Sequence, residues 1–404
     1  MKHIGIALLG LGVVGSGTYK ILQEKREEIK KVYDVDAEVV CVLERDLSKA
    51  DALNIPRSMV WNGIEEVCAS DKVDVVAEFF GGTRPAKDFL AAALRAGKNV
   101  VTSNKELLAK HWKDLEEAGK EGNACIFFEA SCVGGVPVIR ALEESMQGND
   151  IKELYGIVNG TTNYILSDMT LNGSDYQSVL KECQRLGYAE ANPAADVEGY
   201  DSTYKLSILS SLAFRKHIDY TDIKREGITE IAQADIAFAK ENGYVIKLLA
   251  IAKNGADGVE AHVHPVLVPS GHLLASVSGS FNALYVVGDN VGELMFYGRG
   301  AGMLPTGSAI VSDIIFSATR ERKVRYPFIT SENEKVLSDF QSACYLRFDN
   351  KDKESVIKAL NAKGVKYEEK ATGEFAAFVL SAISESLLQS IIEETKPLGY
   401  IRLM

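Results

Sequence analysis

The sequence predicts an α/β protein built from three successive units, and three observations support this. At the start, a strand, a glycine turn and a helix follow one another, as in the first unit of a doubly wound parallel sheet. From about residue 151 the pattern indicates an α+β domain with a sheet of its own. From about residue 343 it indicates a βαββαβ module. The predicted ranges are 1–150, 151–325, a linker at 326–342, and 343–404, with a helix at 306–320 placed where it can return to the first domain.

The composition narrows the class of protein. The 404 residues are 46% hydrophobic and 25% charged, as in ordinary globular proteins. The formal net charge of −11 argues against nucleic acid or an anionic membrane as partner. No stretch approaches the ~20 apolar residues of a membrane span. The six cysteines are scattered and form no Cys-x-x-Cys pair, so we expect reduced thiols in a cytoplasmic protein.

The first unit carries a dinucleotide-binding fingerprint. A buried strand at about residues 3–9 leads directly into Gly10-Leu-Gly12-Val-Val-Gly15, and a helix follows to about Tyr33. The first two glycines allow a tight turn that brings backbone amides to a pyrophosphate, and Gly15 lets the helix approach the strand. The alternative is a glycine turn that serves only packing. Its place between a strand and a helix favours a Rossmann-type cofactor domain.

The end of the second strand indicates which nicotinamide cofactor is used. This strand ends in Glu44-Arg45, with Lys49 close behind. An acid at this place usually binds the ribose 2′-hydroxyl of NAD, whereas an arginine accommodates the 2′-phosphate of NADP. Because arginine can fork two hydrogen bonds onto a phosphate, we favour NADP bound by Arg45, with NAD as the alternative.

Two lysines are candidates for the chemistry. Lys105 follows a strand at 99–102 and begins a helix at the carboxyl edge of the sheet, where ligands bind. A cation is unfavourable in the first turn of a helix, which argues against a merely solvated lysine. Lys205 lies four residues after Asp201, so the two share one helix face beside an acidic loop. This arrangement suits the ammonium of a small amino acid; the alternative is an ordinary surface ion pair.

Several short motifs, taken in order, resemble the homoserine dehydrogenase family over nearly the whole chain. They are Gly10–Gly15, Thr102-Ser-Asn-Lys105, Glu129-Ala-Ser-Cys-Val-Gly-Gly-Val-Pro137, Asn159-Gly-Thr-Thr162, Gly187-Tyr-Ala-Glu190, Asp196-Val-Glu-Gly-Tyr-Asp201, Lys205 and Gly298-Arg-Gly-Ala-Gly302. The resemblance implies the NAD(P)-dependent interconversion of L-aspartate 4-semialdehyde and L-homoserine, in the biosynthesis of threonine, methionine and isoleucine.

The resemblance also implies roles for individual residues. Lys205 looks like the catalytic proton donor, and Lys105 like the second lysine at the reacting carbonyl. The residues that look like substrate contacts are Glu190, Asp201, Asp196, Thr161 and Tyr188. Those that look like cofactor contacts are Gly10, Gly12, Val13, Val14, Gly15, Arg45, Ser103, Lys105 and Gly302. The loop at 129–136 resembles a site for a structural monovalent cation such as sodium, bound by main-chain oxygens of Glu129, Cys132, Gly134 and Val136.

The tail resembles an ACT domain, a module that senses small amino acids. Its first loop, at residues 349–354, lacks the Pro-Gly pair that is usual in the family. Because that loop contributes to the effector site, we expect threonine inhibition to be weak or absent. A sheet with helices on one face leaves the other face open, so we expect the tail to contribute to self-association. By the resemblance the central domain is a substrate and dimerisation domain, and we expect a homodimer or homotetramer.

Two other classes compete with this interpretation. One is a different Rossmann oxidoreductase, such as an amino-acid dehydrogenase that uses ammonia. The other is a sensor that binds NADP and an amino acid without turnover. The Asn159-Gly-Thr-Thr162 motif and the paired lysines argue against the first, and the retention of both lysines and every acid argues against the second.

Overall fold

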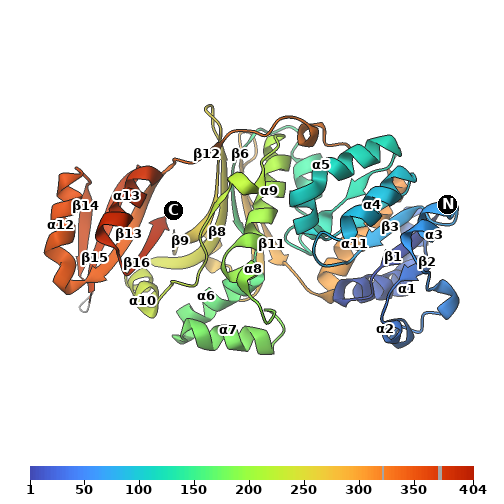
Figure 1. The fold of residues 1–404 in the computed structure, drawn as a ribbon, viewed down its shortest axis with the longest axis horizontal. Helices are drawn as coiled ribbons and strands as arrows, with labels where there is room; N and C mark the ends of the chain where they lie inside the picture. Colours follow the sequence, from blue (N-terminus) through green and yellow to red (C-terminus); the bar gives the residue numbers. More distant parts are fainter. Residues whose placement is uncertain (321–322, 372–374) are drawn as a thin grey trace.

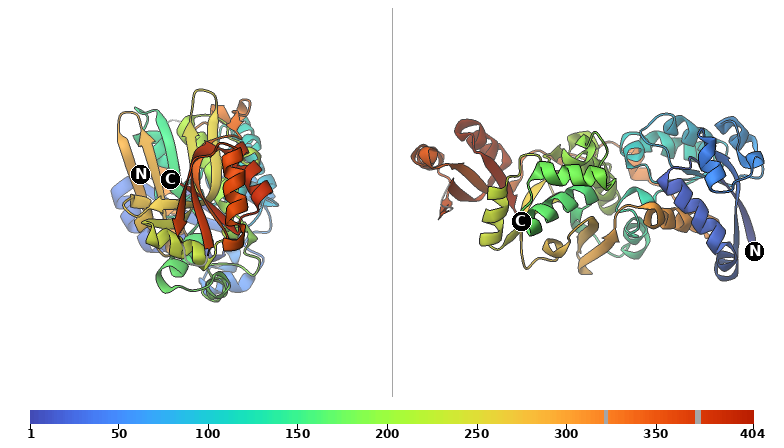
Figure 2. Two further views of the ribbon diagram at one scale, coloured as in Figure 1. Left: turned by 90° about the vertical axis from the view of Figure 1, so that its left-hand side faces the viewer. Right: turned by 90° about the horizontal axis from the view of Figure 1, so that it is seen from below.

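The protein is elongated, with the N-terminal sheet and the tail module at opposite ends and the central sheet between them (Figure 1), as two further views also show (Figure 2). The computed structural model describes residues 1–320, 323–371 and 375–404. Residues 321–322 and 372–374, which fall in the predicted central domain and tail, lie outside the described residues. No helix within the described ranges has the length and apolarity to cross a membrane.

Five parallel strands form the first sheet, in the order β2-β1-β3-β4-β5, which confirms the predicted parallel sheet. The strand order reverses between β1 and β3, and ligands of such sheets bind at the carboxyl ends of the strands at this point. Its elements are β1 (Lys2–Leu9), α1 (Val13–Tyr33), β2 (Val35–Leu43), α2 (Leu47–Ala52), α3 (Ile64–Ala69), β3 (Val75–Glu78), α4 (Ala86–Arg95), β4 (Asn99–Thr102), α5 (Lys105–Glu121) and β5 (Ile126–Phe127).

A helix from much later in the chain, α11 (Met303–Thr319), packs against α1 and contacts β2 and β4. Two glycines allow the close approach of α1 and α11. A Cβ on Gly17 would lie 2.3 Å from the main-chain oxygen of Met303, and one on Gly307 would lie 3.0 Å from the Gly17 carbonyl carbon. The chain therefore returns to the first sheet after completing the central one.

The central sheet has the order β11-β10-β6-β8-β9. Its elements are β6 (Ile151–Ile157), α6 (Gly160–Asn172), α7 (Tyr176–Arg185), α8 (Ala194–Val197), α9 (Tyr200–Phe214), β7 (Lys224–Arg225), α10 (Gln233–Glu241), β8 (Tyr244–Asn254), β9 (Val259–Pro269), β10 (Phe281–Gly288) and β11 (Gly292–Arg299). The sequence pattern did not predict β11, because this edge strand is half-exposed and lacks a clear apolar alternation.

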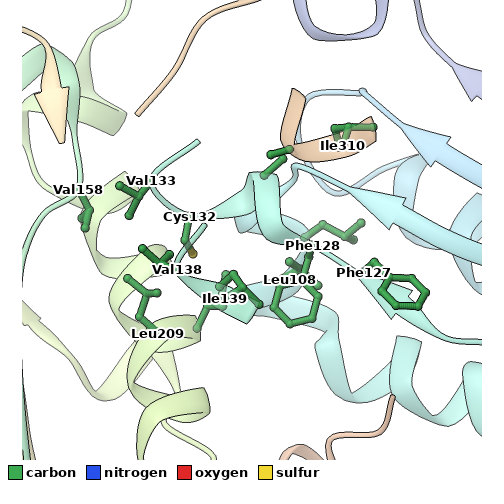
Figure 3. Close-up of a cluster of buried hydrophobic side chains, with 14 of the residues drawn as sticks. Leu108, Phe127, Phe128, Cys132, Val133, Val138, Ile139, Val158, Leu209 and Ile310 are labelled. Carbon is green, nitrogen blue, oxygen red and sulfur yellow. The ribbon is translucent and has the colours of Figure 1, made fainter. Parts of the chain in front are cut away.

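Apolar side chains from the first and central units form one continuous core (Figure 3). The segment after β5 lies in the middle of this core: Cys132, Val133 and Val138 are fully buried. These three side chains belong to the same cluster as Leu108 of α5 and Leu209 of α9. Because α5 and α9 carry the two candidate lysines, this packing fixes their relative position.

The tail has the order βαββαβ, and its strands align as β16-β13-β15-β14. Its elements are β13 (Gln341–Asp349), α12 (Lys353–Ala362), β14 (Tyr367–Ala371), β15 (Phe375–Ser384), α13 (Glu385–Thr395) and β16 (Gly399–Leu403). Strand β16 pairs in parallel with β9, so the tail and central strands form one sheet of 11 strands, which also includes β7 and β12 (Val336–Leu337).

The face of the tail sheet opposite its helices is partly covered, whereas the sequence predicted an open face. The Tyr345 ring stacks on Phe238 of α10 with ring centroids 4.0 Å apart. The Arg347 guanidinium donates to Asp235 of α10 at 2.8 Å. Part of the apolar face is thus covered within the same chain, because α10 folds back against it. This removes the physical reason for expecting self-association through that face.

A buried ion network joins the tail to the central unit. Arg402 of β16, which is 2% exposed, donates to Glu226 at 2.7 and 2.9 Å. It also donates to Glu385 of α13 at 2.8 and 3.1 Å. The charges of both carboxylates, Glu226 and Glu385, are thus compensated by the single guanidinium of Arg402. Removing one partner of a buried pair leaves an uncompensated charge, so this arginine should contribute strongly to the attachment of the tail.

We expect Arg402→Met to lower the thermal midpoint strongly, because breaking a buried pair costs about 3–5 kcal/mol. The matched control is Arg185→Met, whose ion pair with Glu182 lies at the surface, with the arginine 69% exposed. That change should stay within about 0.5 kcal/mol. Thermal unfolding of both variants checks this. Equal midpoints for the two variants would contradict it.

Candidate active site

A cavity of about 500 Å³ opens at the carboxyl ends of β1, β2 and β3, where the strand order reverses. The fingerprint glycines, the end of β2 and the segment after β3 line it: Gly10, Gly12, Leu43, Glu44, Arg45, Lys49, Phe79, Phe80 and Gly81 are among the lining residues. This is the place where doubly wound sheets bind dinucleotides. Its position is the one that the adenosine half of a dinucleotide takes in such sheets.

The fingerprint turn has the conformation that cofactor binding requires. Gly10 has a φ of +102°, and a Cβ on Gly15 would lie 2.2 Å from the Gly10 oxygen. Val13, the first residue of α1, is 64% exposed, so the helix N-terminus is accessible. The free amides at that end suit a pyrophosphate. At the other end of the expected cofactor path, Gly302 precedes α11 with a φ of +124°.

The acid at the end of β2 is engaged by the protein itself. Glu44 accepts hydrogen bonds from the amides of Leu11 at 2.8 Å and Asp46 at 3.0 Å, and the Lys49 ammonium lies 3.5 Å away. Burial raises the pKa of Glu44, but these partners outweigh burial and lower it below the usual value. Arg45 is exposed at the rim of the cavity.

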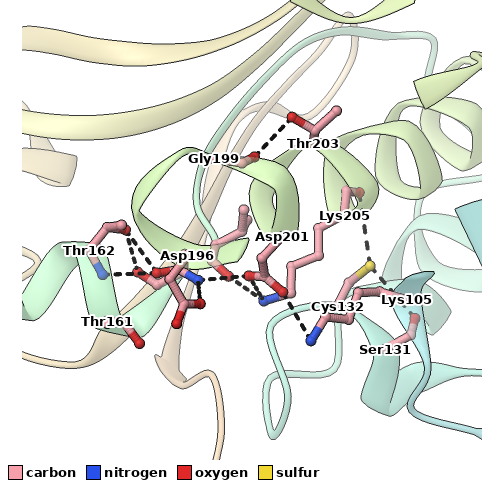
Figure 4. Close-up of polar contacts among 12 residues, drawn as sticks. Lys105, Ser131, Cys132, Thr161, Thr162, Asp196, Gly199, Asp201, Thr203 and Lys205 are labelled. Atoms are coloured by element: carbon pink, nitrogen blue, oxygen red, sulfur yellow. Dashed lines mark hydrogen bonds and ion pairs between the residues drawn. The ribbon is translucent and has the colours of Figure 1, made fainter. Parts of the chain in front are cut away.

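Two lysines converge on one buried carboxylate (Figure 4). Lys205 and Asp201 lie one turn apart in α9, with Lys205 Nζ 2.7 Å from Asp201 Oδ2. Lys105, the first residue of α5, places its Nζ 3.0 Å from Asp201 Oδ1. Lys205 also donates to the main-chain oxygen of Val158 at 2.6 Å. The structure therefore brings both predicted catalytic lysines to the same acid.

The charges in this cluster hold one another in place. Burial raises the pKa of the Asp201 carboxyl, but the ammonium groups of Lys105 and Lys205 outweigh it and hold the pKa well below its usual range. In turn, the Asp201 carboxylate raises the pKa of Lys105. Asp201 and Lys205 are 5% and 8% exposed, whereas the Lys105 side chain is 40% exposed. A fixed positive charge therefore faces the accessible side of the cluster.

Asn159 is a site residue that sequence reasoning missed. Its Nδ2 donates to Asp196 at 2.7 Å and to Asp201 at 2.9 Å. Its Oδ1 accepts from the Thr162 amide at 2.8 Å and caps α6. Burial raises the pKa of Asp196, and the Asn159 amide opposes that shift. The motif was visible in the sequence, but only the fold shows that one amide bridges two acids.

Three other residues were predicted to contact the substrate, and the structure places them differently. Thr161, in the first turn of α6, donates to the main-chain oxygen of Tyr188 at 2.8 Å. The Tyr188 ring packs edge-on against Tyr164, with centroids 5.3 Å apart. Glu190 is exposed in the loop between α7 and α8, where its main-chain oxygen accepts from Gln184 at 3.2 Å. The structure brings Thr161 and Tyr188 together and leaves Glu190 in solvent.

The loop at 129–136 was predicted to bind a cation through main-chain oxygens. Its side chains are not available as ligands: the Glu129 carboxylate accepts from the amides of Ile139 at 2.8 Å and Arg140 at 3.0 Å. Burial raises the pKa of Cys132 to about 12, which keeps the thiol protonated. Gly134 has a φ of +50°, and a Cβ there would lie 2.2 Å from the Gly300 oxygen.

The main-chain oxygen of Val136, the last predicted ligand of that loop, accepts from the amide of Val138 at 2.9 Å. This oxygen keeps one free lone pair.

Two other predicted cofactor residues lie near the cavity. Ser103 lies two residues before Lys105, and its main-chain oxygen accepts from the Lys105 amide at 3.2 Å. Val14 is half-buried in the first turn of α1. Ser103 and Val14 therefore lie at the carboxyl edge of the first sheet, on the side of the cavity.

A parallel sheet with a dinucleotide crevice, beside a lysine pair and a cluster of acids, defines an oxidoreductase that uses a nicotinamide cofactor. The family model "Homoserine dehydrogenase, NAD binding domain" matches residues 10–129, and "Homoserine dehydrogenase" matches residues 137–315. A homoserine dehydrogenase of Bacillus subtilis is 40% identical over 377 residues, covering 91% of this chain and 87% of that protein. The chain belongs to the homoserine dehydrogenase family and is an oxidoreductase of amino-acid biosynthesis.

Solved structures agree with this assignment. The homoserine dehydrogenase of Thiobacillus denitrificans superposes with a TM-score of 0.92 at 35% identity, covering 100% of this chain and 99% of that one. A hyperthermophilic archaeal homoserine dehydrogenase in complex with NADPH gives a TM-score of 0.69 at 28% identity, covering 80% of this chain and 100% of that one. The two competing classes, an ammonia-using dehydrogenase and a non-catalytic sensor, are therefore wrong.

We expect Asn159→Asp to move the acid limb of the pH profile of kcat/KM to higher pH. The new carboxylate replaces an amide donor beside Asp196 and raises the pKa of that acid further, so protonation begins at a higher pH. A charge this close shifts a pKa by about 1–3 units. Asn159→Ser, which retains a capping oxygen without the charge, is the control. An unmoved acid limb in Asn159→Asp would contradict the expectation.

Proposed function

We propose that this protein reduces L-aspartate 4-semialdehyde to L-homoserine, and catalyses the reverse reaction, with Lys205 as the proton donor. The observation that carries the proposal is the convergence of Lys105 and Lys205 on Asp201. Negative charge grows on the carbonyl oxygen as hydride adds to its carbon, and a positioned ammonium stabilises that charge and supplies a proton. The bound nicotinamide would supply the hydride.

The two lysines suit different parts of this task. Because the Asp201 carboxylate raises the pKa of Lys105, its side chain stays charged and can orient and polarise the carbonyl. Lys205 is held at two oxygens, those of Asp201 and Val158, so its ammonium has a fixed direction and a third proton free for the substrate. We therefore assign the electrostatic role to Lys105 and proton transfer to Lys205.

The ammonium of the substrate requires a carboxylate with a free oxygen. Asp196 meets this requirement, since one of its oxygens accepts from Asn159 while Asp201 is already shared by both lysines. We propose that Asp196 accepts directly from the ammonium and that Asp201 contributes to the substrate site by holding the two lysines. We further propose that Glu190 joins Asp196 from the loop between α7 and α8, and that Thr161 and Tyr188 form the wall of the substrate site.

We propose NADP as the preferred cofactor, with NAD also accepted. The engagement of Glu44 by two main-chain amides supports this, because a ribose hydroxyl would have to share its carboxylate with them. Arg45 and Lys49 at the rim of the cavity offer cations to a 2′-phosphate. The NADPH complex of the archaeal relative agrees. The predicted glycines, Val13, Val14, Ser103 and Gly302 complete the proposed cofactor site.

We propose that a monovalent cation such as sodium is held by the oxygens of Glu129, Cys132, Gly134 and Val136. The left-handed turn at Val133 and Gly134, with φ values of +54° and +50°, supports this because it redirects successive carbonyls. Such a cation would hold the shape of the loop, which lies between α5 and α9, and would take no part in hydride or proton transfer.

We propose that residues 343–404 act as an ACT-like module, and the βαββαβ order supports this. We keep the predicted domain ranges with it.

We also propose that the enzyme is a homodimer or homotetramer in the cytoplasm. Strands β11 and β14 end the strand order of the large sheet, and such edges are sites of pairing between copies. All six cysteines are free, as expected in a reducing compartment. Weak or absent threonine inhibition stays a prediction.

We expect Lys205→Met to lower kcat by about 10²–10⁴-fold, the usual loss when general acid–base help is removed. The dissociation constant for NADPH should stay near that of the wild type, because the Lys205 ammonium donates to Asp201 and Val158 rather than to a proposed cofactor residue. Steady-state kinetics and NADPH fluorescence titration measure the two effects. Lys25→Ala, at an exposed ion pair on α1, is the control. Retention of most of the wild-type kcat in Lys205→Met would refute the role of Lys205.

We expect Arg45→Ala to lower kcat/KM for NADPH far more than for NADH. A hydrogen bond to a charged group is worth about 1.5–3 kcal/mol, so the NADPH preference should fall by about 10- to 100-fold. Assays with both cofactors measure the ratio, with Lys49→Ala as the comparison. If the ratio changes in Lys49→Ala and not in Arg45→Ala, Lys49 decides the cofactor.

A further inference from the structure

A chain of hydrogen bonds begins at a fully buried acid beneath the cofactor cavity. Glu78 is the last residue of β3 and is 0% exposed. Its Oε1 accepts from the amide of Phe80, and its Oε2 accepts from the Thr102 hydroxyl at 2.6 Å. The Thr102 hydroxyl oxygen accepts in turn from the main-chain amide of Asn104 at 3.0 Å. The Glu78 and Thr102 side chains thus link the ends of the neighbouring strands β3 and β4.

The chain of hydrogen bonds ends at the start of α5. Asn104 caps this helix, accepting from the Leu107 amide at 3.0 Å, and its Nδ2 donates to the Gly82 oxygen at 2.7 Å. Lys105 is the next residue, and its ammonium lies 3.0 Å from Asp201. The direction of α5, and with it the place of the Lys105 ammonium, therefore depends on the orientation of Asn104.

The chemistry of the groups gives this chain one direction. A threonine hydroxyl has a single hydrogen, and when Glu78 is ionised this hydrogen points to Glu78, because an ionised carboxylate only accepts. The Thr102 oxygen is then free to accept from Asn104. Burying an acid against an amide and a hydroxyl is costly compared with an apolar side chain of similar size. Burial accordingly raises the pKa of Glu78 to about 7, against the effect of its donors.

We propose that Glu78 is a positioning residue: through Thr102 and Asn104 it sets the start of α5 and holds Lys105 against Asp201. This inference rests on the proposed role of Lys105 in the reaction. It assigns to Glu78 no contact with the substrate. The Phe80 amide, bonded to the other carboxylate oxygen, ties the same residue to the wall of the cofactor cavity.

The test is Glu78→Gln, which preserves size. The glutamine oxygen can still accept from the Phe80 amide, but its NH2 group then faces Thr102 and removes the acceptor of the hydroxyl hydrogen. We expect kcat to fall by about 10- to 100-fold, as for small displacements of catalytic groups. The dissociation constant for NADPH should change far less than kcat, because the Phe80 contact is preserved. A wild-type kcat would overturn the proposal.

A double-mutant cycle separates positioning from a general structural effect. If Glu78 acts through Lys105, Glu78→Gln should have no further effect on single-turnover NADPH oxidation in the Lys105→Ala background. The same fold-loss in both backgrounds would overturn the inference. A wild-type rate in Lys105→Ala alone would instead refute the proposed role of Lys105, so the two failures are distinguishable.

Threonine variants keep the test decisive if Glu78→Gln does not fold. Thr102→Ser retains the hydroxyl, so its kcat should stay well above that of Thr102→Val. Thr102→Val has the same shape without donor or acceptor and should reproduce the loss of kcat expected for Glu78→Gln. Equal rates in these two variants, with equal thermal midpoints, would overturn the inference.

Discussion

The carboxylate of Asp201 is the group on which the active site depends. One oxygen faces Lys105 from the first sheet, and the other faces Lys205 and Asn159 from the central unit. Isolated, a charge this deeply buried would be strongly unfavourable. Flanked by two ammonium groups it is stable, and removing both lysines would leave its buried charge uncompensated. The site therefore exists only when the first and central units are packed together.

The rest of the architecture holds these units at a fixed distance. The loop that follows β5 fills the space between α5 and α9, and α11 brings the chain back onto α1 through the close contact of Gly17 and Gly307. Packing of this kind cannot be deformed gradually, because cores are dense and side chains interdigitate. The two lysines are thus positioned by apolar contacts far more numerous than their own polar ones.

The tail is attached to the same frame by its last strand and by the Arg402 network. Glu226, which binds Arg402, directly precedes Gly227, where a Cβ would lie 2.2 Å from the Val197 oxygen. The Ile228 amide donates to the same Val197 oxygen at 2.9 Å. Val197 belongs to α8, the short helix that also carries Asp196. The tail is therefore linked, through Glu226 and the two residues after it, to the segment that bears a proposed substrate acid.

The sequence by itself determined the local features of this protein. The fingerprint turn, the parallel first sheet, the sharing of one helix face by Asp201 and Lys205, and the βαββαβ order all follow from short-range periods, glycine positions and the four-residue spacing of a helix. Only the tertiary structure decided that Lys105 meets Asp201, that Asn159 bridges two acids, and that α10 covers part of the tail sheet. These contacts join residues far apart in the chain, and no local pattern encodes the packing that brings them together.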